Sequence, residues 1–233
     1  MDFLKEFADK LHETFIVDDR WMYLVNGLKT TLLITFFAVI IGMLLGFLVA
    51  IVRSTHDKTG KLKILNFIAR IYLTVIRGTP VVVQLLITYF VIFASVAINQ
   101  VFVAILAFGL NSGAYVAEIV RSGIMSVDNG QIEAGSSLGL SYSKTMLYIV
   151  IPQAFKNVLP ALANECIVLL KETSVAGYIA IEDLTKGGDL IRSKTYEAFL
   201  PLIAVALIYL VMVMILSWLV SKLERRLAKN ERR

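Results

Sequence analysis

The chain has 233 residues, of which 58% are hydrophobic, and its mean hydropathy of +0.75 is too high for a soluble domain of this length. Its net charge of +5 is placed largely beside apolar stretches, which is a topology signal of membrane proteins and does not require a nucleic-acid partner. The single cysteine, Cys166, excludes an internal disulfide. These features predict a multi-span membrane protein with no separate soluble domain.

The amino-terminal segment, residues 1–20, carries apolar side chains at helical spacing, with acids and lysines between them. The apolar positions are Phe3, Leu4, Phe7, Leu11 and Phe15. This pattern predicts an amphipathic helix lying on the membrane surface.

Five later segments are long and apolar enough to cross the hydrocarbon core of a bilayer, which takes about 20 residues. The predicted spans are residues 22–52, 81–98, 101–122, 152–181 and 199–220. Residues 64–76 predict a further helix that is shallow or tilted. Gly42 and Gly46, four apart in the first span, predict a close helix-packing face. The expected fold class is therefore all-α, a polytopic integral membrane protein with five transmembrane helices plus an amino-terminal amphipathic helix.

The distribution of lysine and arginine predicts the orientation. We divide the chain into an interfacial helix, a transmembrane domain and a basic tail, which are residues 1–20, 21–221 and 222–233. Residues 53–77, residues 121–156 and the tail carry fifteen Lys and Arg, whereas 1–20 and 182–197 carry six, offset by ten acids. We therefore expect a multi-pass protein of the plasma or inner membrane, with its amino terminus outside and its carboxyl terminus in the cytoplasm.

A polar, glycine-punctuated loop, residues 131–152, separates the third and fourth spans and is called the knuckle below. It predicts two short helices, over 132–138 and 141–151, with a break at Gly139. Pro152 would then open the next span, because proline is tolerated in the first turn of a helix. Such a knuckle beside a bilayer suggests a docking surface for another protein, and the alternative is an ordinary linker between membrane helices.

The knuckle resembles the EAA loop of ABC-type importer permeases in the order Glu133-Ala134-Gly135, then Gly139, then Ile149-x-Ile151-Pro152. Two positions depart from the family pattern, since Gly135 replaces the usual second alanine and Ile151 the usual leucine. In that family the loop seats in a cleft on the ATP-hydrolysing subunit. The resemblance therefore implies contact with a partner ATPase through a set of loop residues, namely Glu133, Ala134, Gly135, Gly139, Ser141 and Pro152.

Ionisable residues inside membrane spans are costly and are candidates for function. Glu165 and Glu172 are seven residues apart in the fourth span, so they share one helix face. Two acids on one face suit a cationic group in a water-lined cavity. The alternative is that they pair with Lys or Arg on neighbouring helices or on a partner subunit.

Two other polar sites have local interpretations. Thr79-Pro80 predicts a helix break, which membranes tolerate where it lines a cavity, and Gln84 lies one turn beyond. A simple helix boundary at the interface is the alternative. Glu118 and Arg121, three apart, predict a local ion pair rather than a substrate site.

Three further segments resemble signatures of polar amino acid permeases, namely Arg77-Gly78-Thr79-Pro80, Tyr115-x-x-Glu118-x-x-Arg121-Ser122-Gly123 and Lys171-Glu172-Thr173-Ser174. With the EAA-like loop, the similarity covers most of residues 25–220. It implies a transmembrane subunit of type I architecture from the ABC importers of histidine, glutamine or arginine. In that family two permeases, identical or related, pair around a central path, two ATPases drive alternating access, and an extracellular solute-binding protein delivers the amino acid.

The candidate substrate-binding residues combine the intramembrane polar groups with the permease signatures. They are Glu165, Glu172, Asn164, Thr173, Thr79, Gln84 and Tyr115. The acids favour a cationic amino acid such as arginine, lysine or histidine on Coulombic grounds. Glutamine or another neutral polar amino acid remains an alternative.

The sequence contains no Gly-rich phosphate loop, no nucleophile–base arrangement and no His/Cys cluster. We therefore expect no catalytic residue, metal site or cofactor in this chain, with ATP and Mg²⁺ bound by a partner ATPase. An ion-coupled secondary transporter would use the same carboxylates as proton relays, but it predicts inverted repeats that five unequal spans do not supply. An integral membrane enzyme fits least well.

Overall fold

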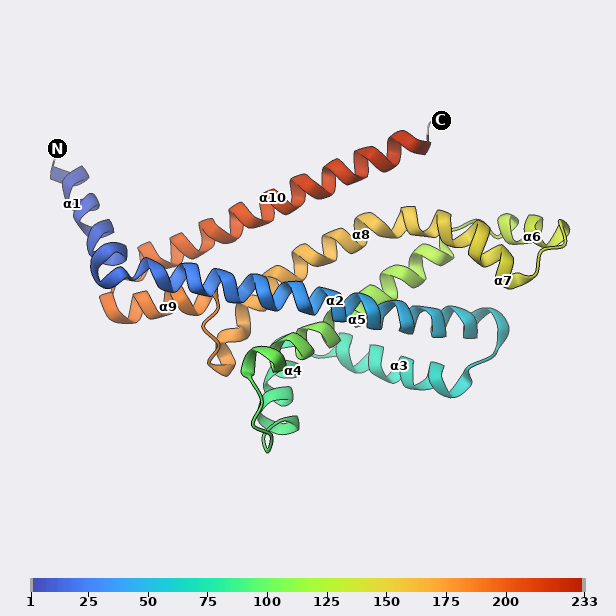
Figure 1. The fold of residues 1–233 in the computed structure, drawn as a ribbon, viewed down its shortest axis with the longest axis horizontal. Helices are drawn as coiled ribbons and strands as arrows, with labels where there is room; N and C mark the ends of the chain where they lie inside the picture. Colours follow the sequence, from blue (N-terminus) through green and yellow to red (C-terminus); the bar gives the residue numbers. More distant parts are fainter. Residues whose placement is uncertain (1, 232–233) are drawn as a thin grey trace. The chain divides into compact units, whose positions relative to one another are not determined.

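The computed structural model describes residues 2–231 and the side chains of residues 4–226. Within this range the chain forms helices and no strands, as Figure 1 shows. The α-helices are α1 (Asp2–Leu11), α2 (Trp21–Thr59), α3 (Lys63–Gly78), α4 (Val81–Ile87), α5 (Gln100–Met125), α6 (Asn129–Ser137), α7 (Tyr142–Thr145), α8 (Ile151–Glu172), α9 (Leu184–Thr195) and α10 (Phe199–Glu231). Short π- or 3₁₀-helical segments cover His12–Ile16, Val17–Asp19, Thr88–Ile92, Met146–Val150 and Thr173–Ile179.

Among the described residues, four helical stretches are long and apolar enough to cross a membrane. These are Trp21–Thr59, Gln100–Met125, Tyr142–Ile179 and Phe199–Arg226. A fifth span exists if the pair Lys63–Gly78 and Val81–Ile92, bent by 112°, is counted as one. The predicted all-α polytopic fold is therefore confirmed.

The second span differs from its prediction, because its helix ends at Ile92 rather than at residue 98. The Thr88 hydroxyl donates to the Gln84 carbonyl, and the Phe93 N–H bonds the Thr88 carbonyl to close a wide π-turn. Asn99 then caps the next helix, since its side-chain oxygen accepts from the Val101 N–H at 2.8 Å. The apolar residues in 93–98 thus form a turn and not a helix, and hydropathy alone does not distinguish the two.

The amino-terminal segment is helical, as expected, through α1 and the two short segments that follow it. The helix is interrupted at Asp18, whose φ of 56° is left-handed. The Arg20 guanidinium bonds the Glu13 carbonyl at 2.8 Å and the Asp18 carboxylate at 2.9 Å, which holds the chain at this bend. The side chain of Phe3 lies outside the described residues, and a position on the membrane surface remains a prediction.

The chain divides into two compact units. Unit 1 contains residues 1–38, 81–108 and 169–216. Its core includes Leu24 of α2, Leu184 and Ile191 of α9, and Val205 of α10. The buried Asp183 carboxylate begins α9 by accepting the backbone N–H groups of Thr185 and Lys186.

Unit 2 contains residues 39–80, 109–168 and 217–233, and it holds the cavity described below. Its main core joins one face of α5 to α8, with Val116 and Val120 among the α5 residues and Val150, Ala154 and Val158 on the other side. The predicted packing face on α2 is confirmed. A β-carbon on Gly42 would lie 3.0 Å from Ser112, and one on Gly46 would overlap Val116.

The knuckle also lies in unit 2 and begins with α6, which Asp128 caps by accepting the Gly130 N–H. Gly139 adopts φ +78°, a conformation that L-residues avoid, so the predicted break is confirmed. Pro152 does not open a new helix, because the chain is helical without interruption from Tyr142 to Ile179. The π-turn Met146–Val150 directly before it supplies the irregular turn that a proline inside a helix requires.

Candidate functional site

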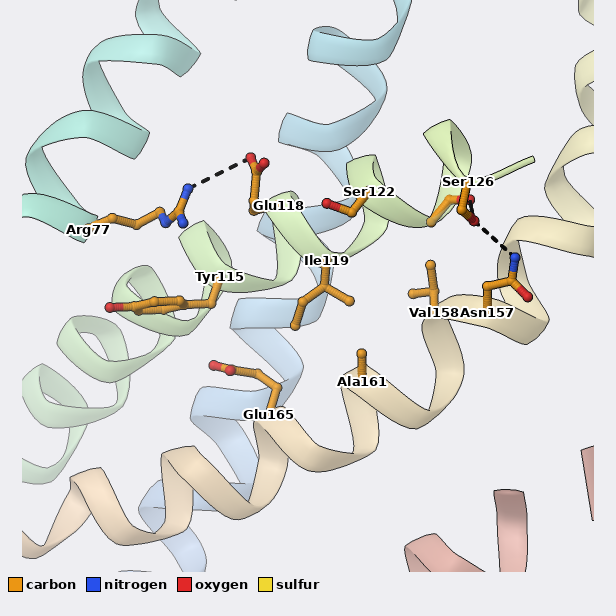
Figure 2. A pocket seen from close by; sticks show the side chains of 11 residues that line it. Arg77, Tyr115, Glu118, Ile119, Ser122, Ser126, Asn157, Val158, Ala161 and Glu165 are labelled. Atoms are coloured by element: carbon orange, nitrogen blue, oxygen red, sulfur yellow. Dashed lines mark hydrogen bonds and ion pairs between the residues drawn. The ribbon is translucent and has the colours of Figure 1, made fainter. Parts of the chain in front are cut away.

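A cavity of about 540 Å³ opens in unit 2 between residues of α3, α5 and α8 (Figure 2). Its volume is in the range of small-molecule sites. Helix α3 supplies Arg77, the inward face of α5 supplies Tyr115, Glu118 and Ser122, and α8 supplies Asn157 and Glu165. Apolar side chains of Ile119, Val158 and Ala161 complete the wall. The site therefore combines an apolar surface with two carboxylates and one guanidinium.

Glu165 is the most buried of these charged groups, with 9% of its surface exposed. Its carboxylate accepts a hydrogen bond from the Ser112 hydroxyl of α5 at 2.9 Å. Because α8 packs tightly on α5 through its Val and Ala face, the helix backbone carrying Glu165 is held in place. The carboxylate is thus positioned at the cavity by packing and by a neutral donor.

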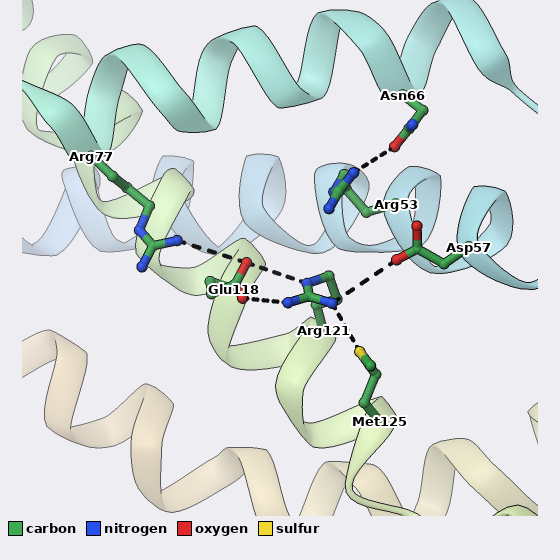
Figure 3. Close-up of polar contacts among 7 residues, drawn as sticks. All are labelled: Arg53, Asp57, Asn66, Arg77, Glu118, Arg121 and Met125. Atoms are coloured by element: carbon green, nitrogen blue, oxygen red, sulfur yellow. Dashed lines mark hydrogen bonds and ion pairs between the residues drawn. The ribbon is translucent and has the colours of Figure 1, made fainter.

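Glu118 and Arg121 form the local ion pair that their spacing predicts, with oxygen–nitrogen distances of 2.6 and 3.3 Å (Figure 3). Arg121 also lies 3.9 Å from the Asp57 carboxylate of α2. On the other side, Arg77 of α3 approaches Glu118 at 3.8 Å and stands 5.9 Å from the centre of the Tyr115 ring. This chain of charges ties α2, α3 and α5 together at the edge of the cavity.

Of the predicted substrate residues, the structure brings together Glu165 and Tyr115. Asn164 instead lines a separate cavity of about 370 Å³ with Pro160 of α8 and Ser217 of α10. Successive residues on an α-helix point about 100° apart, so Asn164 cannot share the direction of Glu165. The expectation that Asn164 joins Glu165 in one site is therefore not supported by the geometry.

Glu172 and Thr173 belong to unit 1, at the end of α8, and do not line the Glu165 cavity. Thr173 is fully buried, where its hydroxyl donates to the Leu170 carbonyl and lies 3.4 Å from the Thr35 hydroxyl of α2. Glu172 is half-buried. The side chain of Thr173 thus serves helix packing in this structure.

Thr79 and Gln84 flank the bend of the broken span. The Thr79 hydroxyl donates to the Val75 carbonyl at 2.8 Å, satisfying a carbonyl at the carboxyl end of α3. Gln84 is half-buried on α4. Neither lines the Glu165 cavity. The helix break predicted at Thr79-Pro80 is present, since α3 ends at Gly78 and α4 begins at Val81.

Arg77 lines the cavity, although from sequence it was placed only in a permease signature and in a basic segment. Its positive charge assigned it to a basic loop spanning 53–77, whereas the structure places it in the last turn of the 16-residue helix α3. The helix predicted over residues 64–76 stops one residue before Arg77, so the apolar spacing located this residue but did not show that it faces a cavity.

The knuckle presents Glu133, Ala134 and Ser141 on its exposed surface. Gly135 is buried, and a β-carbon there would lie 2.7 Å from Thr145 Cγ2, which explains why a smaller residue stands in place of alanine. Large apolar side chains are exposed beside these positions, with Leu138 at 79% and Tyr148 at 68%. The knuckle therefore offers a partly apolar surface anchored to the unit 2 core through Ile132 and Met146.

Within the described side chains, no three His, Cys, Asp or Glu residues gather in a metal-binding arrangement. The polar groups of the cavity are suited to binding and orienting a small charged molecule.

Residues 42–229 match the family described as binding-protein-dependent transport system inner membrane component. The chain is 39% identical over 211 residues to the arginine transport system permease protein ArtQ of Bacillus subtilis, covering 90% of this chain and 94% of that protein. It is 36% identical over 207 residues to the glutamine transport system permease protein GlnP of Escherichia coli K12, covering 88% and 92%.

Solved structures of similar chains also come from ABC transporters. A chain from a crystal structure of an amino acid ABC transporter with histidines aligns with a TM-score of 0.83 and 43% identity, covering 91% of this chain and 98% of that one. A chain of the MetNI methionine ABC transporter shares the fold, with a TM-score of 0.75 at 18% identity and coverage of 89% and 97%. ATP hydrolysis in such transporters belongs to a separate ATPase subunit, so this chain is a non-catalytic membrane component. The chain therefore belongs to the family of binding-protein-dependent transport system inner membrane components, as a permease subunit of the amino acid ABC transporter type.

Proposed function

We propose that this permease imports a polar amino acid that carries a positive charge, such as arginine, lysine or histidine. The observation that carries the proposal is the buried Glu165 carboxylate at the wall of the unit 2 cavity. Because Arg121 already pairs with Glu118, the carboxylate of the wall that can meet a cationic group of the ligand is Glu165. In a site of low effective dielectric, the attraction between Glu165 and such a group favours a cationic ligand.

A neutral substrate such as glutamine is the second candidate. It is favoured by the Ser112 hydroxyl on Glu165 and by the polar side chains of Ser122 and Asn157, which could meet an amide. The similar relatives include both an arginine and a glutamine permease. The two candidates differ in whether the Glu165 charge, rather than its hydrogen-bonding capacity, is needed.

The proposal assigns the coupling of transport to ATP hydrolysis to the knuckle. Its exposed face, with Glu133, Ala134 and Ser141, would seat on an ABC ATPase subunit, while Gly135, Gly139 and Pro152 shape the two helices. Because Val150 and Met146 join the knuckle to the α5–α8 core, a push on the knuckle is transmitted to the helices that line the cavity. The remaining proposed partners are a second permease, identical or related, and an extracellular solute-binding protein.

In the proposed topology, residues 1–20 lie in the outer interface, 21–221 form the transmembrane domain and 222–233 form a cytoplasmic tail. Residues 53–62 and the knuckle would then face the cytoplasm together. This arrangement puts the amino terminus outside the cell membrane and the knuckle on the side where ATP is available.

The test of substrate class is uptake by the whole transporter carrying Glu165→Gln, which keeps the size and hydrogen-bonding atoms of the side chain but removes its charge. We expect arginine uptake to fall at least about tenfold, because a charge-assisted contact is lost. Glutamine uptake should change much less. The control is Glu172→Gln, which removes an acid that does not line this cavity. Unchanged arginine and lysine uptake in Glu165→Gln would refute the cationic assignment.

A further inference from the structure

Arg77 lies in the last turn of α3 rather than in a loop, and its side chain is 44% exposed where it faces the cavity of unit 2. Helix α3 starts at Lys63 and runs beside α2, as the Arg53–Asn66 hydrogen bond of 2.9 Å and the packing of Ala69 on Val49 show. At 1.5 Å per residue, Arg77 is about 20 Å along the axis from Lys63. At the carboxyl end of α3 the guanidinium therefore reaches the cavity, where its donors are accessible to a small ligand.

The protein itself engages this guanidinium weakly. Among the described residues, its contacts are one ion pair at 3.8 Å to Glu118 and the face of the Tyr115 ring at 5.9 Å. Glu118 is already held by Arg121, which donates to both of its oxygens at 2.6 and 3.3 Å. A strong Arg–carboxylate pair has two parallel N–H groups that donate at about 2.8 Å. The single approach of Arg77 to Glu118 at 3.8 Å is much looser, so most of the N–H donors of Arg77 are available to a ligand.

These donors face the same cavity as Glu165, but they come from a different helix (Figure 2). Arg77 is the only cationic side chain among the cavity residues that the structure describes. The wall thus offers one planar, positively charged guanidinium on α3 and one buried carboxylate on α8. Every α-amino acid at neutral pH carries the complementary pair, a carboxylate and a positively charged ammonium.

We propose that Arg77 binds the α-carboxylate of the transported amino acid. The inference rests on the proposed function, because it takes the unit 2 cavity as the substrate site. A guanidinium fork matches the planar carboxylate better than a point charge does. The ammonium or cationic side chain of the ligand is then directed towards Glu165.

This division of roles separates two kinds of selectivity. The α-carboxylate is common to all amino acids, so Arg77 contributes to the affinity for every one of them. Glu165 contributes according to the charge of the ligand side chain. Loss of Arg77 therefore weakens the binding of arginine and of glutamine alike, whereas loss of the Glu165 charge changes the ratio of the two affinities.

The experiment is equilibrium binding of radiolabelled L-arginine and L-glutamine to the purified permease–ATPase complex without the solute-binding protein. Agmatine, which is arginine without its carboxylate, serves as a competitor. We expect agmatine to compete at least about tenfold more weakly than unlabelled arginine, because a site built for a polar group rejects ligands lacking it. We expect Arg77→Gln to lower the affinity of whichever amino acid the wild type binds by a similar factor, and to abolish the preference over agmatine.

Two further variants separate a ligand contact from a structural role. Arg77→Lys keeps the charge but not the fork, so it should bind more tightly than Arg77→Gln and less tightly than the wild type. Asp57→Asn alters the same chain of charges through Arg121 but does not touch the cavity, so it should retain amino acid binding and its preference over agmatine. Retention of the ATPase subunit by each variant checks that the complex is intact.

The outcomes distinguish this inference from the proposed function. If Glu165→Gln weakens arginine binding while agmatine competes with the wild type as well as arginine does, the cavity is the site and the Arg77 assignment is wrong. Equal losses in Asp57→Asn and Arg77→Gln would also overturn it, because the integrity of the chain of charges would then be what matters. If the wild-type complex binds no amino acid, or Glu165→Gln and Arg77→Gln both bind like the wild type, the proposed site itself fails.

Discussion

At the scale of single residues, a glycine without a side chain decides how closely α5 approaches α8. Gly123 of α5 faces Val158 of α8, and a β-carbon on Gly123 would overlap Val158 Cγ2. Both residues line the cavity, so this contact also shapes its wall. The close approach is one reason why Glu165, two turns further along α8, stays within hydrogen-bond distance of Ser112 on α5.

We predict that Gly123→Ala destabilises the protein by about 1–3 kcal/mol, the usual cost of overpacking a core. In a Val158→Ala background, the same change should be neutral or stabilising by up to about 1 kcal/mol, because alanine favours the helix over glycine. The measurement is the thermal unfolding midpoint of the four variants of this double-mutant cycle in detergent. Equal effects in both backgrounds would show that the contact with Val158 is not the cause.

Asp183 is a second residue whose environment makes a measurable prediction. Burial raises the pKa of its carboxyl, and the backbone N–H groups of Lys186 and Thr185 offset part of that rise. An acid whose pKa is higher in the folded state binds its proton more tightly there, so stability falls as pH rises above the ordinary value near 3.8. Above the raised pKa, the free-energy cost of the buried charge no longer changes with pH.

Asp183→Asn keeps an acceptor at the start of α9 and removes the titration. The unfolding midpoint of the variant minus that of the wild type should therefore increase as the pH is raised from about 4 towards 7. A difference between the two midpoints that is the same at every pH comes from the altered helix cap. It does not change how the difference varies with pH. A difference that stays flat, or that decreases with pH, would contradict the raised pKa.

At the scale of elements, the knuckle combines a rigid attachment with one turn that requires a positive φ. Gly135 lets α6 lie against the helix that begins with α7, and Gly139 reverses the chain between them with φ +78°. No atom lies within 4 Å of a β-carbon built on Gly139, so substitutions there act through the backbone rather than through a clash. This separates the conformation of the turn from the packing of the knuckle.

We predict that Gly139→Pro releases the ATPase subunit during purification of the complex, because proline fixes φ near −65°. Gly139→Ala should weaken retention and Gly139→Asn should weaken it less, since asparagine tolerates the left-handed region. Gly60 provides a matched control, because it has φ +68°, equally open surroundings and a place in the α2–α3 hairpin. Full retention of the ATPase by Gly139→Pro would exclude the knuckle as the coupling element.

At the scale of the whole molecule, the proposed topology assigns opposite membrane sides to two exposed serines. Ser141 lies at the turn of the knuckle, and Ser193 lies near the end of α9. In a Cys166→Ala background, which removes the native thiol, each can be changed to cysteine with little change in size. A membrane-impermeant thiol reagent added to intact cells should label Ser193→Cys strongly and Ser141→Cys only after the membrane is opened. Labelling of Ser141→Cys from outside would reverse the orientation.

Much of this architecture follows from local sequence. Spans are long apolar runs, breaks are marked by Gly139 and Pro80, and the Glu118–Arg121 pair follows from helix geometry. Boundaries were less predictable, since residues 93–98 are apolar but form a turn capped by Asn99. The uninterrupted helix through Pro152 was also missed, because it depends on a π-turn that no residue type announces.

The sequence by itself determined the class of protein, the all-helical fold and the knuckle, because hydrophobic length and turn chemistry are properties of neighbouring residues. Only the tertiary structure decided which polar groups share a cavity, because that depends on how three helices distant in sequence pack. It joined Arg77 and Tyr115 to Glu165, and it turned Asn164 towards α10. Arg77 shows the reason most clearly, since a charge read as a loop signal lines the cavity once α3 is packed along α2.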